Sequence, residues 1–113
     1  MTKSGDIGRL AELAQLVLDH RLGQLRVSAT ELERSRMQLA SVNLAAQPAD
    51  LGPVTAEKVA LAYDRWADVR RSELNLVIAR QTVDWMEARS EAQTAFGRVQ
   101  ALQGLATRLR EKR

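Results

Sequence analysis

The sequence predicts an all-α protein, with two long helices that fold back on each other as an antiparallel coiled-coil hairpin. Helix-favouring residues, mainly Ala, Leu, Arg, Gln and Glu, dominate the 113 residues, of which 27% are charged. Both prolines lie within one short segment. On either side of that segment, apolar residues recur every three or four positions over long stretches, which is typical of helices that pack along one seam.

The expected turn is the segment 47–55, which contains Pro48, Gly52 and Pro53. Because a residue before proline is disfavoured in α geometry, the first helix should end near residue 46. Glycine and proline together are typical of turns. Thr55 is the expected N-cap of the second helix, and Asp50 is a weaker candidate. We therefore expect a single helical hairpin over residues 1–113, with helices at about 4–46 and about 56–110.

The expected seam of the first helix is a heptad series of apolar residues: Ala11, Leu18, Leu25, Leu32 and Leu39. The expected seam of the second helix runs from Ala56 to Leu109 and is rich in alanine. Arg70 and Gln81 interrupt it. Polar residues in a seam commonly specify the register of the two helices, and they also serve as contacts to a partner. The sequence leaves both roles open for Arg70 and Gln81.

The hairpin predicted in this way leaves apolar residues uncovered. Folding at the turn should bring Leu18 near Trp85, so that the first helix runs out near residue 98 of the second. Five apolar residues should then project past it: Val99, Leu102, Leu105, Ala106 and Leu109. Others lie outside the seam, among them Leu16, Val17, Met37, Leu61, Leu76 and Met86. Because two helices enclose no interior, we expect either a dimeric four-helix bundle or docking onto a larger protein.

The densest group of aromatic and arginine residues is Tyr63, Trp66, Arg70 and Arg71, close to the turn. Trp and Arg are enriched at the centres of protein interfaces, so this group is a candidate partner-binding cluster. Arg70 follows Trp66 by four residues, and Arg89 follows Trp85 by the same interval. That spacing allows a cation–π contact, although the rings could equally do no more than cover the seam.

Residues that would indicate catalysis or metal binding are sparse. Cysteine is absent and His20 is the single histidine, which makes a poor zinc site. The sequence contains no glycine-rich phosphate loop and no Ser/His/Asp arrangement. We therefore expect no enzyme, no cofactor, no metal and no small-molecule substrate.

Charge and hydropathy limit the partners and the location. The formal charge is +3, and the two signs are interleaved along the chain, which argues against nucleic-acid binding. No apolar run approaches the ~20 residues that a membrane span requires. The first residues lack the apolar stretch of a signal peptide, so we expect a cytoplasmic protein that binds protein.

The segment 95–105, AFGRVQALQGL, resembles the C-terminal pattern of the FliJ/YscO family, in which a basic residue is followed by spaced leucines. These proteins are stalk-like components of flagellar and virulence type III export. The resemblance implies a cytoplasmic hairpin that contacts the export ATPase and the export gate, with its free helix ends entering the ATPase ring. Two alternatives remain: a self-associating four-helix-bundle scaffold or small chaperone and, more remotely, a helical enzyme like the small chorismate mutases, which would need a third helix.

Overall fold

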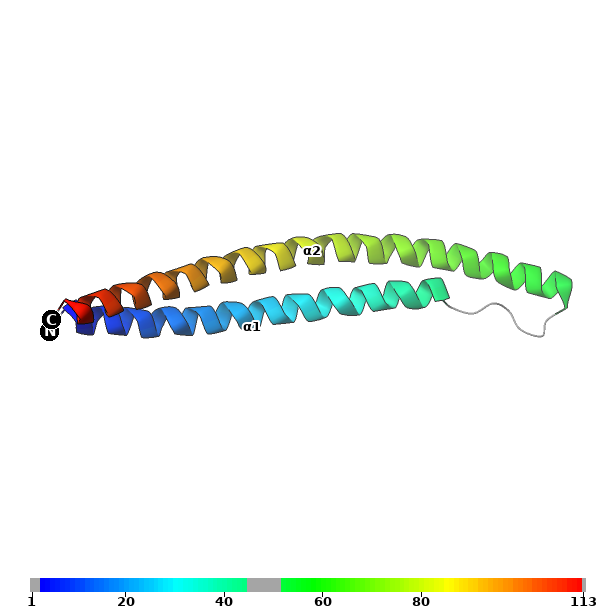
Figure 1. Cartoon of the computed structure of the whole chain (residues 1–113). Helices are drawn as coiled ribbons and strands as arrows, with labels where there is room; N and C mark the ends of the chain where they lie inside the picture. Colours follow the sequence, from blue (N-terminus) through cyan, green and yellow to red (C-terminus); the bar gives the residue numbers. More distant parts are fainter. Residues whose placement is uncertain (1–2, 45–51, 113) are drawn as a thin grey trace. The chain divides into compact units, whose positions relative to one another are not determined.

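The computed structural model describes residues 3–44 and 52–112, and nearly all of them belong to two α-helices. Helix α1 spans Lys3–Leu44 and helix α2 spans Pro53–Glu111 (Figure 1). The fold is an all-α antiparallel helical hairpin, as the sequence predicts. The expected helix bounds, about 4–46 and 56–110, lie within three residues of the observed ones.

The start of α2 differs from the prediction. The backbone N–H of Ala56 donates to the carbonyl oxygen of Gly52 at 2.8 Å, which makes Gly52 the N-cap and Pro53 the first helical residue. Proline suits this position because its missing N–H would have no partner there and its φ is already helical. The expectation that Thr55 caps the helix is wrong, because Thr55 lies inside its first turn. The other candidate, Asp50, lies outside the described residues.

The chain divides into two compact units, and both helices contribute to each. The terminal unit consists of Met1–Ala29 and Asp84–Arg113, and the turn unit consists of Thr30–Val83. In each unit α1 and α2 lie side by side and run in opposite directions (Figure 1). Each unit is therefore a short length of two-helix seam with its own buried residues.

The core of the terminal unit is small and rich in alanine. Leu18 of α1 is buried in one cluster with Ala95 and Val99 of α2, and Ala14 packs against this cluster. One turn further along α1, the Arg21 guanidinium pairs with the Glu91 carboxylate at 2.8 Å. Alanine in the seam brings the two helix backbones close together, but it buries little apolar area per turn.

The core of the turn unit is built around Val42, Ala67 and Leu74, with Leu39 and Tyr63 packed against them. Of these five residues, only Val42 was not expected in the seam. Its burial shows that the seam of α1 continues to within two residues of the last described position of the helix.

The register of the two helices differs from the expected one. The expected fold brings position 21 opposite position 81, whereas Arg21 binds Glu91, about ten residues further along α2. Leu18 accordingly packs with Ala95 and Val99 and not near Trp85. Val99, expected to project past the end of α1, is only 4% exposed. The expectation of an uncovered C-terminal overhang is therefore wrong.

The overhang lies instead at the other end of α2, within the turn unit. Figure 1 shows the first turns of α2 lying beyond the described end of α1. Three apolar side chains of these turns are exposed: Val54, Val59 and Leu61. The shifted register covers the C-terminal end of α2 and leaves this stretch without α1 beside it.

Candidate functional site

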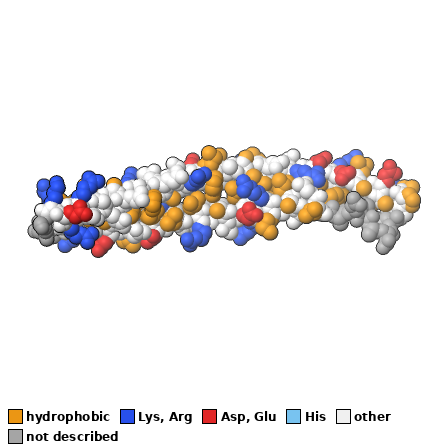
Figure 2. Space-filling view, viewed as in Figure 1, with side chains coloured by type: hydrophobic (Ala, Val, Ile, Leu, Met, Phe, Trp, Pro, Cys, Tyr) orange, Lys and Arg blue, Asp and Glu red, His pale blue; other side chains and the backbone are white. Residues whose placement is uncertain are grey.

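Large apolar side chains are exposed on both helices of both units. In Figure 2 they form patches between charged side chains on the visible face. In the terminal unit they include Leu10, Leu13, Leu16, Val27 and Phe96, and in the turn unit Met37, Leu61, Trp66, Val69 and Leu76. The expectation that apolar residues outside the seam stay exposed is confirmed for most of them. Contiguous exposed apolar surface of this kind marks a site of interaction.

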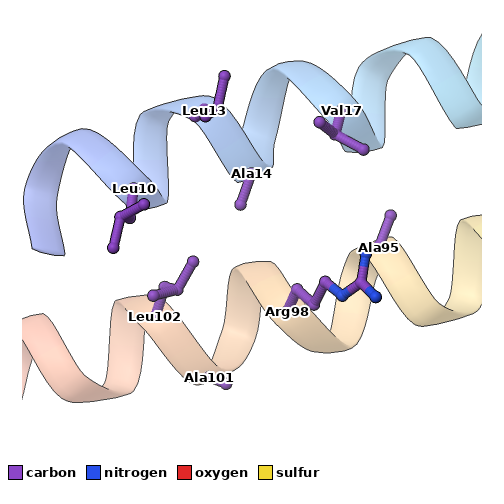
Figure 3. A pocket seen from close by; sticks show the side chains of 8 residues that line it. All are labelled: Leu10, Leu13, Ala14, Val17, Ala95, Arg98, Ala101 and Leu102. Atoms are coloured by element: carbon purple, nitrogen blue, oxygen red, sulfur yellow. The ribbon is translucent and has the colours of Figure 1, made fainter.

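An apolar groove of about 390 Å³ lies between α1 and α2 in the terminal unit (Figure 3). We call it the terminal groove. Eight residues line it, four from α1 and four from α2, and seven of them are apolar. The residues from α1 are Leu10, Leu13, Ala14 and Val17, and those from α2 are Ala95, Arg98, Ala101 and Leu102. In Figure 3, Leu10 and Ala14 point toward α2, while Ala95 and Leu102 point toward α1.

Helical spacing explains why these residues meet. The four residues from α1 follow one another at intervals of three, one and three positions, so they form one strip beside the seam. The residues from α2 form the facing strip. Alanines and leucines from these two strips line the groove together, and Leu13 is 57% exposed.

Arg98 is the one charged residue in the lining of the terminal groove. Its side chain extends along α2 toward Ala95 (Figure 3). Among the described residues, none makes a hydrogen bond or an ion pair with the Arg98 guanidinium. A cation without a partner beside an apolar surface is a potential attachment point for a carboxylate.

A smaller, polar hollow of about 240 Å³ shares Val17, Ala95 and Arg98 with the terminal groove. Arg21 and Glu91 also line it, and they are already paired with each other. Arg21 donates in addition to the Gln24 side-chain carbonyl at 3.1 Å. The charged groups of Arg21 and Glu91 in the polar hollow are therefore paired within the chain. Among the described residues that line the two hollows, Arg98 is the cation without a partner.

The residues of the predicted aromatic and arginine cluster are not all free to bind a partner, because Tyr63 and Arg71 make contacts to α1 whereas Trp66 is exposed. Tyr63 donates its hydroxyl to the Val42 carbonyl oxygen at 2.6 Å. Arg71 donates from Nε to the Asn43 side-chain oxygen at 2.7 Å and pairs with Asp68 at 3.1 Å. These two residues tie α2 to the end of α1. Trp66 remains half exposed, with its ring centroid 5.5 Å from that of Tyr63.

The two expected cation–π pairs have different outcomes. The guanidinium carbon of Arg89 lies 5.5 Å from the centroid of the Trp85 ring, which confirms that pair. Arg70 instead pairs with Glu73 at 3.2 Å. The interface role proposed for this arginine stays a prediction.

The C-terminal residues predicted to bind a partner are not equally accessible. Val99 is buried by α1, and Leu102 and Leu109 are half-buried. Leu105 is exposed. Leu102 also lines the terminal groove. Any partner at this end therefore meets a surface made by both helices.

Gln81, one of the two polar residues in the seam of α2, is half-buried. Its side-chain oxygen is buried and has no hydrogen-bond partner among the described residues. A buried acceptor without a partner costs stability. The buried side-chain oxygen of Gln81 therefore adds no stability to the isolated hairpin.

The sequence prediction did not include the terminal groove. Leu10 and Leu13 were not predicted as site residues because neither lies on the heptad seam, and Arg98 entered only through the resemblance of the segment 95–105. The available signal was the spacing of Leu10, Leu13 and Val17, which places three large apolar residues on one flank of the helix. In the observed register that face of α1 lies beside α2. The sequence of α1 alone does not predict which part of α2 lies beside it.

Within the described part of the chain, no group of three or more His, Cys, Asp or Glu residues could hold a metal ion. Over the same residues, neither helix has a stretch that could cross a membrane. Comparison with protein-family models, with curated proteins and with solved structures found no match. Any functional proposal therefore depends on the surface itself and on the resemblance in the segment 95–105.

Proposed function

We propose that this chain is a non-enzymatic, cytoplasmic protein-interaction component of the FliJ/YscO kind, a stalk or chaperone that contacts the ATPase and the gate of a flagellar or type III export apparatus. The observation that carries the interaction role is the terminal groove with the exposed leucines along its edge. A two-helix seam buries little, and the exposed apolar residues would lose unfavourable contact with water on binding protein.

The family assignment is supported by the hairpin architecture and by the resemblance of residues 95–105. The shifted register changes how such a stalk would meet a ring. The end presented by the terminal unit is a pair of packed helices, because α1 covers Val99. The sequence predicted that a single helix protrudes at this end, and α2 does not protrude alone there.

The alternative is self-association into a four-helix bundle that serves as a scaffold or small chaperone. The observation that favours it is the exposure of large apolar residues in both units, including Met37 and Leu76 of the turn unit. A second hairpin would cover such residues on both helices at once.

Sedimentation velocity with the full chain and the purified export ATPase of the same organism tests the proposal. The expected result is a complex of the ATPase ring with the chain at micromolar concentrations, and a chain that is monomeric alone. Absence of a complex at tens of micromolar chain would contradict the stalk role. A dimer that persists on dilution would favour the bundle.

A further inference from the structure

We propose that the terminal groove binds one amphipathic α-helix of another protein, with an apolar stripe that enters the groove and a carboxylate that pairs with Arg98. This inference rests on the proposed interaction function, for which it names the binding surface and the chemistry of the partner. It does not require the partner to be an export ATPase.

The shape of the groove favours a helix as its occupant. Each wall is a helical strip with side chains three to four positions apart, and side chains of a third helix repeat at the same intervals. Alanines from both walls line the groove, namely Ala14, Ala95 and Ala101. Small residues allow a third helix to approach closely, and the leucines of α1 would pack around its apolar stripe.

The charge around the groove favours an acidic partner. Arg98 is unpaired among the described residues and lies in an otherwise apolar lining. Figure 2 shows Lys and Arg side chains gathered near the chain termini. Segments 3–14 and 98–112 contain six basic and three acidic residues: Lys3, Arg9, Arg98, Arg108, Arg110 and Lys112 against Asp6, Glu12 and Glu111. A partner carboxylate would gain a charge-assisted hydrogen bond there.

The same charges argue against a second copy of this chain in the groove. Two copies packed groove to groove would bring the same basic surplus together. The one carboxylate that lines the adjoining polar hollow is Glu91, and it is already bound to Arg21 at 2.8 Å. A second copy would therefore bring no unpaired carboxylate from these walls to Arg98.

The test uses the full chain and three fluorescent synthetic peptides, each a helix of about 18 residues with leucines at i, i+3, i+7 and i+10. The peptides differ only in the residues beside the stripe, which are Glu, Gln or Lys. Fluorescence anisotropy should show the Glu peptide binding about tenfold more tightly than the Lys peptide, with the Gln peptide between them. Failure of the Glu peptide to bind, or equal affinity for all three, overturns the proposal.

Two leucines of α1 provide a matched pair of variants. Leu13 lines the groove, whereas Leu16 does not, and Leu16 is 65% exposed. Leu13→Glu should weaken binding of the Glu peptide by about tenfold or more, and Leu16→Glu should change it by less than about twofold. Circular dichroism checks that both variants remain helical. Equal effects of the two variants would overturn the assignment of the groove.

Arg98→Glu tests whether the charge of Arg98 selects an acidic peptide. Arg98 is exposed, so this substitution should not unfold the chain. It should reverse the order of the peptides, so that the Lys peptide binds best. An unchanged order would overturn the role of Arg98. If the chain alone forms a dimer that Leu13→Glu dissociates, a second copy fills the groove and the proposal fails. The peptide results are independent of the ATPase experiment, so the groove and the stalk role fail separately.

Discussion

The hydroxyl of Tyr63 in α2 donates a 2.6 Å hydrogen bond to the main-chain carbonyl oxygen of Val42 in α1. Val42 lies two residues before the last described position of α1, where helix carbonyls lack partners within their own helix. The next residue, Asn43, accepts from Arg71 of α2. Side chains of α2 thus satisfy the end of α1 and hold the two helices in one register.

Tyr63→Phe removes this hydrogen bond while keeping the ring. We expect the variant to lower the free energy of unfolding by about 1 kcal/mol, because the Val42 carbonyl loses a partly buried donor. Denaturant unfolding measures the change, and hydrogen exchange should show faster opening of the last turns of α1. Thr107→Val is the control, because Thr107 donates only to the Gln103 carbonyl of its own helix. Equal losses in the two variants would contradict a specific role for Tyr63.

Leu74 is the largest fully buried side chain of the described chain, with 2% of its surface exposed. Leu74→Ala should lower the free energy of unfolding by about 2–5 kcal/mol, since it removes apolar contacts and leaves a cavity in the small core of the turn unit. Leu76→Ala, two residues along α2, should cost less than about 0.5 kcal/mol, because Leu76 is 55% exposed. Chemical denaturation followed by circular dichroism compares them. Similar costs for both leucines would show that Leu74 is not part of a packed core.

The helices and their buried faces could be predicted from the sequence. Proline and glycine chemistry locates the break between α1 and α2, and the heptad pattern identifies Leu18, Leu32, Ala67 and Leu74 as buried residues. Both signals are local, because each depends on residues within a few turns of one helix. Tertiary contacts are not needed to read them.

The register could not be predicted in the same way. The apolar residues of a seam repeat every 3.5 residues. If one helix slides along the other by about 10 residues, which is close to three repeats, the same apolar stripes still face each other. The observed shift from position 81 to Glu91 as the partner of Arg21 is of this size. What distinguishes the two registers is a few polar contacts, such as Arg71 with Asn43, which the apolar pattern does not reveal.

The expectation that Val99 projects past the end of α1 was wrong for the same reason. The overhang expected at Val99 followed from the register that the sequence predicted. The groove beside Leu13 exists because, in the observed register, residues 95–102 of α2 lie opposite the face of α1 that carries Leu10, Leu13 and Val17. Exposure of residues outside the seam, such as Leu16 and Trp66, depends only on their position on one helix. That part of the surface was therefore predictable.

Arg21 and Glu91 join the helices of the terminal unit, but they should add little stability. Their side chains are 37% and 52% exposed, so water screens the charges. A double-mutant cycle with Arg21→Gln and Glu91→Gln should give a coupling free energy below about 1 kcal/mol, and added salt should reduce it. The cycle is measured by denaturant unfolding at low and high salt. A coupling above about 2 kcal/mol that salt does not change would indicate a pair shielded from water.

Gly97 and Gly23 lie inside the long helices, where glycine is less stable than alanine because it retains more freedom in the unfolded chain. A Cβ added at either position meets no atom within 4 Å, so alanine fits without a clash. Gly97→Ala and Gly23→Ala should each raise the free energy of unfolding by about 1 kcal/mol, and together by about twice that amount. Thermal and denaturant unfolding of the single and double variants check this. If Gly97→Ala destabilises the chain while Gly23→Ala stabilises it, the result would contradict the open space around a Cβ at Gly97 and would indicate that another chain packs there in solution.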